Sequence, residues 1–133
     1  ATFLERLIER LGLAGVTVAR ARAEELAHDG AHRAAYELAL ARAVAPLPTL
    51  VELALPFLCL GGYLATPKGS AAPHEVTDAA VALQTCGGQV ELLRALDVEG
   101  PEPAPTMVLV RKIADTPDRY PRRPGMPAKR PLR

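Results

Sequence analysis

Strand-like and helix-like segments alternate along the 133-residue chain, and this alternation constrains its fold most strongly. Strands are expected at residues 16–20 (VTVAR), at 36–44 (YELALARAV) and from residue 61 (GGYLAT), each preceded by a helical segment. This order predicts a parallel sheet built from β-α-β units, because parallel strands need long crossover connections. Two final strands, QVELLRAL and TMVLVRKI, have no helix between them, which predicts an antiparallel hairpin at the sheet edge.

The helices are expected where apolar residues recur at helical spacing between Pro and Gly signals. They are TFLERLIERLGL up to Gly12, a short helix ended by Asp29-Gly30, a helix opened by Pro46 and Pro48 that runs to about Leu60, and APHEVTDAAVALQTC up to Gly87-Gly88. Pro56 is expected to kink the third helix or to stop it early. The near-continuous apolar run at 36–44 predicts a strand that is buried on both faces.

Composition places the chain as one domain, or part of a larger one, with a core of Ala, Leu and Val: 49% of residues are hydrophobic and 4% are aromatic. The longest apolar stretch is interrupted by Glu52 and Pro56, so we expect no membrane span, no membrane partner and a cytoplasmic location. Cys59 and Cys86 form no CxxC pair, and the three histidines show no ligand spacing. We therefore expect no metal.

The end of the chain, RKIADTPDRYPRRPGMPAKRPLR, differs sharply from the rest. Residues 111–133 hold eight basic and two acidic residues, whereas residues 1–110 hold eight basic and thirteen acidic residues. Prolines at every third or fourth position exclude a helix and favour an extended strap. Three roles fit such a strap: it contacts RNA, it pairs with the acidic body of the chain, or it is a disordered, solubilising end.

Three stretches of the chain resemble the family of small-subunit rRNA guanine-N7 methyltransferases, called RsmG or GidB. They are TFLERLIERLGLAGVTVARARAEELA, ARAVAPLPTLVELALPFLCLGGYLATPKG and VLVRKIADTPDRYPRRPGMPAKRPL. The Tyr-Pro-Arg-Arg-Pro-Gly core of the tail is the most specific element, followed by Ala-Arg-Ala-Val and Lys-Gly. Together, and in this order, they span most of the chain.

The resemblance implies an α/β protein with a Rossmann-like, class I S-adenosylmethionine-dependent methyltransferase fold, here its C-terminal portion with an antiparallel edge hairpin. It implies a division into residues 1–113, which belong to that domain, and residues 114–133, a Pro/Arg-rich basic tail. The implied enzyme transfers a methyl group from S-adenosylmethionine to N7 of a guanine in 16S rRNA. Guanine N7 has a lone pair and no proton, so this reaction needs placement of the reactants rather than a general base, a nucleophile or a metal.

The resemblance also assigns site residues. Ala23 and Glu24 match the pair that the family places against the adenine, and Arg42 matches an arginine beside the cofactor and the target base. Lys68 matches the Lys-Gly element. Arg42 interrupts an apolar strand, so we expect its guanidinium to be at least half-buried and to have partners. Two plainer roles remain open: Glu24 as a solvated carboxylate at a helix start, and Lys68 as a loop lysine.

The implied partner is 16S rRNA or the small ribosomal subunit, bound by a monomer. Basic side chains of the tail are expected to contact RNA phosphates or to pack over the RNA-binding side of the domain. These side chains, together with Lys68, are Arg119, Arg122, Arg123, Lys129 and Arg130.

The chain departs from the family pattern at its beginning. It contains no Gly-rich loop for the methionine part of the cofactor and no strand that ends in an acidic residue for the ribose. We therefore expect a C-terminal fragment of the pattern, in which the strand at 16–20 is orphaned and an apolar sheet edge is exposed. Two functions compete for such a chain: a truncated methyltransferase, or a non-catalytic fragment that binds RNA or another partner.

Overall fold

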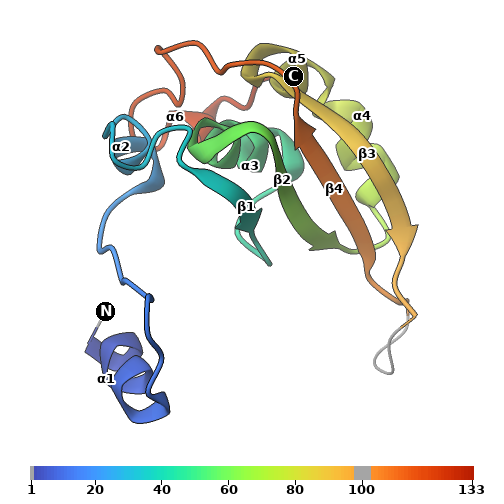
Figure 1. Ribbon diagram of the computed structural model, residues 1–133. Coiled ribbons are helices and arrows are strands. Elements are labelled where there is room, and N and C mark those ends of the chain that lie inside the picture. Colours follow the sequence, from blue (N-terminus) through green and yellow to red (C-terminus); the bar gives the residue numbers. More distant parts are fainter. Residues whose placement is uncertain (1, 98–102) are drawn as a thin grey trace.

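The computed structural model describes residues 2–97 and 103–133 (Figure 1). Its elements, in chain order, are α1 (Thr2–Leu11), α2 (Ala23–Leu26), β1 (Tyr36–Leu40), α3 (Leu47–Ala54), the 3-10 turn η1 (Leu55–Phe57), β2 (Leu58–Lys68), α4 (Ala72–Asp78), α5 (Ala80–Cys86), β3 (Gly88–Ala95), β4 (Thr106–Lys112) and α6 (Met126–Lys129).

The four strands form one sheet in the order β1-β2-β4-β3. β1 and β2 are parallel and are joined through α3, which makes the expected β-α-β unit. β4 is antiparallel to both β2 and β3, so the predicted edge hairpin is confirmed. The Pro-rich connection predicted between its strands lies partly outside the described residues, since residues 98–102 are not among them.

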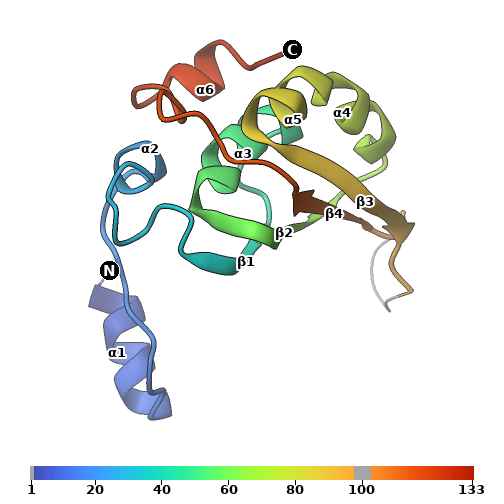
Figure 2. The ribbon, with the colours of Figure 1, turned by 45° about the horizontal axis from the view of Figure 1, so that its top comes forward.

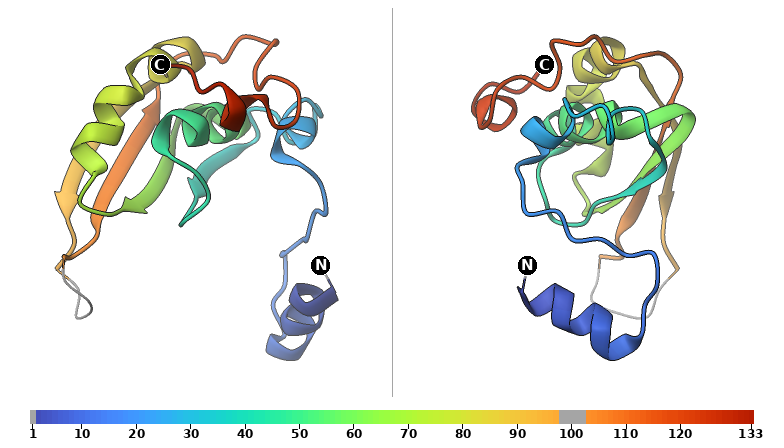
Figure 3. Two further views of the ribbon diagram at one scale, coloured as in Figure 1. Left: turned by 180° about the vertical axis from the view of Figure 1, so that it is seen from behind. Right: turned by 60° about the vertical axis from the view of Figure 1, so that its left-hand side comes forward.

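Helices α3, α4 and α5 cover one face of the sheet, as Figures 2 and 3 show from two sides. Alternate side chains of β4, Val108 and Val110, point into the core beneath these helices because side chains alternate across a strand. Among the described residues, no helix covers the opposite face. The core consists mainly of Leu, Val and Ala, as the composition predicted.

Local signals set the helix ends correctly. α3 ends at Ala54 and continues as a 3-10 turn that contains Pro56, which confirms an early stop rather than a long helix to Leu60. α5 ends at Gly87, which adopts a left-handed φ of 79°, and a Cβ there would lie 2.1 Å from the Ala114 carbonyl oxygen. The fourth predicted helix is divided in two at Ala79.

Two strand predictions were wrong for one physical reason. Residues 16–20 form no strand, because no neighbouring strand among the described residues pairs with them. β1 was expected to be buried on both faces, yet Tyr36, Leu38 and Leu40 are 42%, 53% and 76% exposed. β1 is the edge of the sheet, with β2 as its only neighbour there. The expected exposure of an apolar edge is thus confirmed.

α1 forms as predicted, but it contacts little of the described chain. None of its residues is buried, and its apolar side chains Phe3, Leu4, Leu7 and Leu11 are exposed. Figure 1 shows α1 standing away from the sheet at the end of an extended segment. The amphipathic pattern therefore predicts that a helix forms, but it does not predict what the apolar face of the helix packs against.

Lys112, at the end of β4, is a buried cation with neutral partners. Its Nζ donates to the Leu55 carbonyl at 2.7 Å and to the Thr116 hydroxyl, which itself donates to the Cys86 carbonyl at 2.7 Å. These bonds join β4 to η1 and to the end of α5. Burial lowers the pKa of Lys112 to about 8.

This lowered pKa predicts a pH-dependent stability. Between about pH 8 and pH 10.5 the unfolded chain holds a proton on Lys112 that the folded chain has released, so stability rises with pH in this window. Lys112→Met removes this titration. The wild-type advantage over Lys112→Met in urea unfolding should therefore grow across the window, by up to about 1.4 kcal/mol per pH unit. Lys129→Met, at an exposed lysine, is the control, and a constant wild-type advantage would contradict the prediction.

Candidate functional site

A hollow of about 370 Å³ lies beside the loop that follows the carboxyl end of β1. We call it the α2–α6 hollow. Its lining comes from three separated parts of the chain: Ala21, Arg22, Ala23 and Glu24 at the start of α2; Val44 and Ala45 after β1, with Thr49 and Leu53 of α3; and Pro127 and Ala128 of α6. Figure 2 shows α2, α3 and α6 near one another at the β1 side of the sheet. Ligands of open α/β sheets bind outside the carboxyl ends of the strands, so this is the candidate site.

Ala23 and Glu24, the predicted adenine pair, both border this hollow. The Glu24 side chain is buried, and its Oε1 accepts hydrogen bonds from Arg22 Nη2 at 2.8 Å and from the Gly125 N–H at 2.9 Å. Burial alone would raise the pKa of Glu24, but these hydrogen bonds outweigh it and hold the pKa below its usual value. Glu24 is therefore not a solvated carboxylate: it joins the turn before α2 to the tail.

Arg42 lies outside β1, which ends at Leu40, and its side chain is exposed. The expectation of a half-buried guanidinium was wrong, because only residues 36–40 of the apolar run 36–44 form the strand, and Arg42 follows it. Arg42 instead belongs to the loop that leads into the α2–α6 hollow. In this loop Ala43 has a φ of 55°, an uncommon conformation for a residue with a side chain.

Lys68, at the end of β2, fixes that loop. Its Nζ donates to the Ala45 carbonyl at 2.6 Å and pairs with Glu75 Oε2 at 3.0 Å. The same Glu75 oxygen accepts the Leu47 N–H at 2.8 Å, which is a donor at the start of α3. Lys68 is thus more than a loop lysine in this structure: with Glu75 it holds the loop after β1 against α3.

In the tail of residues 114–133, which we call the strap, the prediction that prolines exclude a helix was wrong for one turn: α6 spans Met126–Lys129, and Pro127 is tolerated at its start. The strap is bound to the body through Arg122. Glu52, on α3, is fully buried, and Arg122 donates to it three times: from its backbone N and Nε to Oε1, both at 2.9 Å, and from Nη2 to Oε2 at 2.7 Å. Nη2 also donates to the Arg130 carbonyl at 2.7 Å. The guanidinium of Arg122 is therefore committed to the body of the chain.

Arg33 makes a second attachment of the strap. Its guanidinium donates to the carbonyl of Ala27 and to those of Thr116, Pro117 and Tyr120 in the strap, at 2.8 to 3.2 Å. Nearby, His28 Nε2 lies 2.8 Å from the Pro121 carbonyl oxygen. The strap thus contacts both the α2 region and α3, which excludes a disordered end for these residues.

The remaining predicted RNA contacts, Arg119, Arg123, Lys129 and Arg130, have exposed side chains on the strap. Arg119 lies 5.2 Å from the centre of the Tyr120 ring, in cation–π distance. The structure thus separates the predicted set into one paired arginine, Arg122, and four exposed cations.

Sequence inspection missed Glu52 and Arg33 as partners of the strap. Glu52 gave a usable signal, since a carboxylate inside the otherwise apolar helix LPTLVELA must find a partner if it is buried. Arg33 gave none, because nothing in its neighbours shows that its guanidinium collects main-chain carbonyls.

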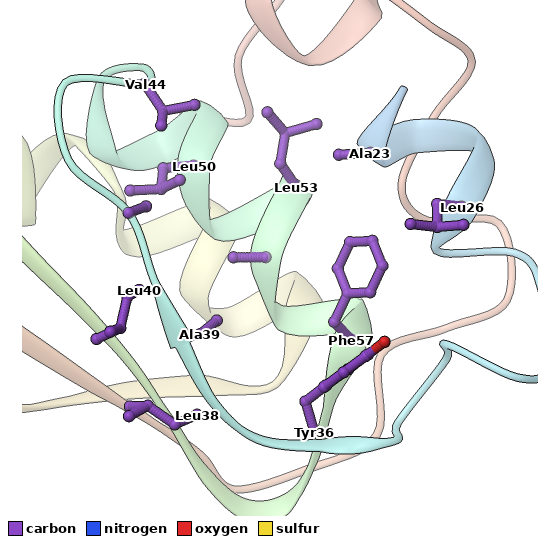
Figure 4. A pocket seen from close by; sticks show the side chains of 12 residues that line it. Ala23, Leu26, Tyr36, Leu38, Ala39, Leu40, Val44, Leu50, Leu53 and Phe57 are labelled. Carbon is purple, nitrogen blue, oxygen red and sulfur yellow. The ribbon is translucent and has the colours of Figure 1, made fainter. Parts of the chain in front are cut away.

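A second hollow, of about 350 Å³, is almost entirely apolar and runs along β1 (Figure 4). Figure 4 shows Ala23 and Leu26 of α2 across from Leu53 and Phe57, with Tyr36 and Leu38 on β1 below them. It adjoins the α2–α6 hollow, with which it shares Ala23, Val44 and Leu53. It has few polar groups with which to orient a ligand.

Comparison with known proteins identifies the family. Residues 1–101 match the family described as GidB, rRNA small subunit methyltransferase G. The chain belongs to this family. A Ribosomal RNA small subunit methyltransferase G of Roseiflexus castenholzii is 46% identical over 132 residues, which are 99% of this chain and 56% of that protein. One of Rubrobacter xylanophilus is 46% identical over 137 aligned residues, 100% of this chain and 52% of that protein.

The chain spans about half the length of these curated relatives. Among solved structures it is similar to an rRNA methylase from Streptococcus thermophilus, with a TM-score of 0.57 and 20% identity over 83% of this chain and 65% of that one. This likeness concerns the fold, and it confirms the Rossmann-like α/β prediction.

Two searches of the described residues found no candidate. No helix there is both long and apolar enough to cross a membrane. No group of three or more His, Cys, Asp or Glu side chains among residues 2–97 and 103–133 could hold a metal ion.

The buried pair predicts strongly non-additive mutations. Arg122→Met strands the fully buried Glu52 carboxylate, and Glu52→Leu strands the guanidinium, so each single change should cost about 3–5 kcal/mol of unfolding free energy at most. The double variant leaves neither charge unpaired and should recover much of that loss. Urea unfolding of all four proteins measures the coupling.

Arg123→Met, at the exposed neighbour, is the matched control and should change stability by less than about 0.5 kcal/mol. Additive effects of Arg122→Met and Glu52→Leu would mean that the two side chains do not depend on each other.

Proposed function

We propose that this chain carries the C-terminal part of an enzyme that transfers a methyl group from S-adenosylmethionine to N7 of a guanine in 16S rRNA. The observation that carries the proposal is the position of Ala23 and Glu24, the residues matched to the family's adenine pair. They border a hollow beside the loop that follows β1, in a chain of the rRNA small subunit methyltransferase G family.

The residues present fit the adenine end of the cofactor. The walls of the hollow include Ala23, Val44 and Leu53, which offer apolar contact to a flat ring, while the turn at 22–24 and the Thr49 hydroxyl add polar groups. When bound, S-adenosylmethionine supplies an electrophilic sulfonium methyl group. The described residues include no Gly-rich loop for its methionine end, so that part must be held by chain outside them.

The protein's contribution is placement. Lys68 and Glu75 hold the loop that carries Arg42, so this exposed side chain is attached to a fixed main chain, two residues before Val44 in the wall of the hollow. N7 loses no proton on methylation, so the reaction needs no general base. An arginine that only orients the target base therefore suits this chemistry. The exposed cations of the strap, Arg119, Arg123, Lys129 and Arg130, offer contacts for RNA phosphates.

A second candidate function is a non-catalytic RNA-binding or interaction fragment. The observation that favours it is the missing Gly-rich loop in a chain that spans about half the length of its relatives. For the methyltransferase, and for a fragment that binds RNA, the expected partner is 16S rRNA or the small ribosomal subunit. A monomeric state and a cytoplasmic location remain predictions.

A cofactor-binding experiment separates these candidates. Calorimetry should detect weak or no S-adenosylmethionine binding by the 133-residue chain, and binding by a joined protein in which the chain is fused to the part of the Roseiflexus relative outside the match. The joined protein should also methylate guanine N7 in 16S rRNA, as read by radiolabel transfer and mapping. Cofactor binding without any transfer to rRNA would contradict the proposed reaction.

Arg42→Ala in the joined protein tests the role of the loop. Because Arg42 is exposed and lies outside β1, its loss should leave the melting temperature nearly unchanged, while methyl transfer falls by roughly a hundredfold if it orients the base. Arg94→Ala, at an exposed arginine of β3 away from the hollow, is the control. Normal turnover with a lowered melting temperature would make Arg42 structural.

Salt dependence tests the strap. Each phosphate contact contributes a slope of roughly −0.7 to −0.9 in the logarithm of affinity against the logarithm of salt concentration. Neutral substitutions at the exposed Arg119, Arg123, Lys129 and Arg130 should flatten the slope for rRNA binding by a few units. An unchanged slope would assign the strap to the body of the chain alone.

A further inference from the structure

The strap does more than cover the body: it forms one wall of the α2–α6 hollow. Pro127 and Ala128 line this hollow opposite the turn that carries Ala23 and Glu24. Pro127 is buried, whereas Ala128 is exposed. Residues a hundred positions apart in the chain thus face the same space.

Direct hydrogen bonds tie this wall to the other walls. The Gly125 N–H donates to Glu24 Oε1 at 2.9 Å, which joins the strap to the turn before α2. The Thr49 hydroxyl donates to the Pro127 carbonyl at 3.1 Å, which joins the strap to α3. Gly125 has a φ of 82°, a conformation that glycine adopts without strain, and it starts α6.

Arg122 anchors both contacts. Its three hydrogen bonds to the buried Glu52 fix the strap on α3 three residues before Gly125, and its bond to the Arg130 carbonyl closes the segment from 122 to 130 around α6. A displaced Arg122 would therefore release Gly125 from Glu24 and move the wall at 127–128. The exposed Arg123, its neighbour, has no such role.

We propose that the strap is a positioning element of the cofactor pocket: Arg122 and Gly125 hold the turn at 22–24, and residues 127–128 form the wall against which the purine end of the ligand packs. This inference rests on the proposed function, because it takes the α2–α6 hollow as the adenine site. It gives adjacent arginines opposite tasks, with Arg122 serving cofactor binding and Arg123 serving RNA binding.

Hydrogen exchange on the 133-residue chain tests the mechanical part without any ligand. Arg122→Met should accelerate exchange of the amides of residues 22–29 by roughly tenfold, because local protection depends on the contacts that hold a segment. Arg123→Met should leave these amides unchanged. Equal exchange in Arg122→Met and the wild-type chain would overturn the proposal.

Ligand affinity tests the pocket part, in the joined protein of the preceding section. Arg122→Met should weaken S-adenosylmethionine binding, measured by calorimetry without RNA, by roughly tenfold or more, because a displaced wall removes the pre-organisation of the pocket. Its salt slope for rRNA should stay unchanged. Arg123→Met should do the converse, flattening the slope and leaving cofactor affinity unchanged.

Ala128→Trp provides a second, independent variant. Ala128 is exposed, so the chain tolerates a larger side chain there without repacking, yet an indole on this wall fills the hollow. Cofactor affinity should fall while the melting temperature stays the same. If Arg122→Met unfolds, this variant decides, and unchanged cofactor affinity in Ala128→Trp overturns the proposal.

The outcomes also distinguish this inference from the proposed function. A joined protein that binds S-adenosylmethionine but methylates no rRNA contradicts the proposed function and leaves the pocket test intact. If the unsubstituted joined protein binds no S-adenosylmethionine, the adenine assignment fails, and the exchange comparison still decides whether the strap holds the turn. Faster exchange with unchanged cofactor affinity would reduce the strap to a structural brace and overturn the proposal.

Discussion

The buried ion pair between Glu52 and Arg122 is the interaction on which the arrangement of the site depends. A carboxylate at 0% exposure inside an apolar helix is tolerated only when it is fully hydrogen-bonded, and the strap supplies its donors. α3 therefore packs on the sheet through one face and receives the strap on another. α3 contributes side chains to the core, binds the strap and lines the hollow, so these three parts depend on the same helix.

A second group of charges fixes main chain in the same way. Lys68, Glu75 and the Leu47 N–H form a small network that closes the loop after β1 onto the start of α3. Arg33 holds the first half of the strap mainly through carbonyl groups, and its Nη2 also lies 3.8 Å from Asp118 Oδ1. The basic side chains thus form two groups: those that hydrogen-bond to other parts of the chain and those that remain exposed for an acidic partner. The net charge alone does not distinguish these two groups.

The sequence predicted what is decided locally. Pro56 stops α3 and Gly87 ends α5, because missing donors and a left-handed φ act within a few residues. The prediction of a strand at 16–20 was wrong because a strand needs a neighbouring strand to pair with, and β-branched residues alone do not provide one. The Arg122 partner could not be predicted either, since 70 residues separate it from Glu52 and five other basic residues of the tail looked equivalent. For the candidate site, the resemblance gave Ala23 and Glu24, which both border one hollow, but only the folded structure shows that the strap forms part of its wall.

The open edge of β1 has a consequence for how this chain behaves in a test tube or a cell. Tyr36, Leu38 and Leu40 present apolar side chains along a strand whose outer edge, in the described chain, has no neighbouring strand to pair with its amides and carbonyls. Such an edge is a template for adding any other extended segment, including the extended residues 16–20 of another copy. Concentrating the isolated chain therefore favours ribbon-like association in proportion to concentration, and covering this edge is a condition for keeping it monodisperse.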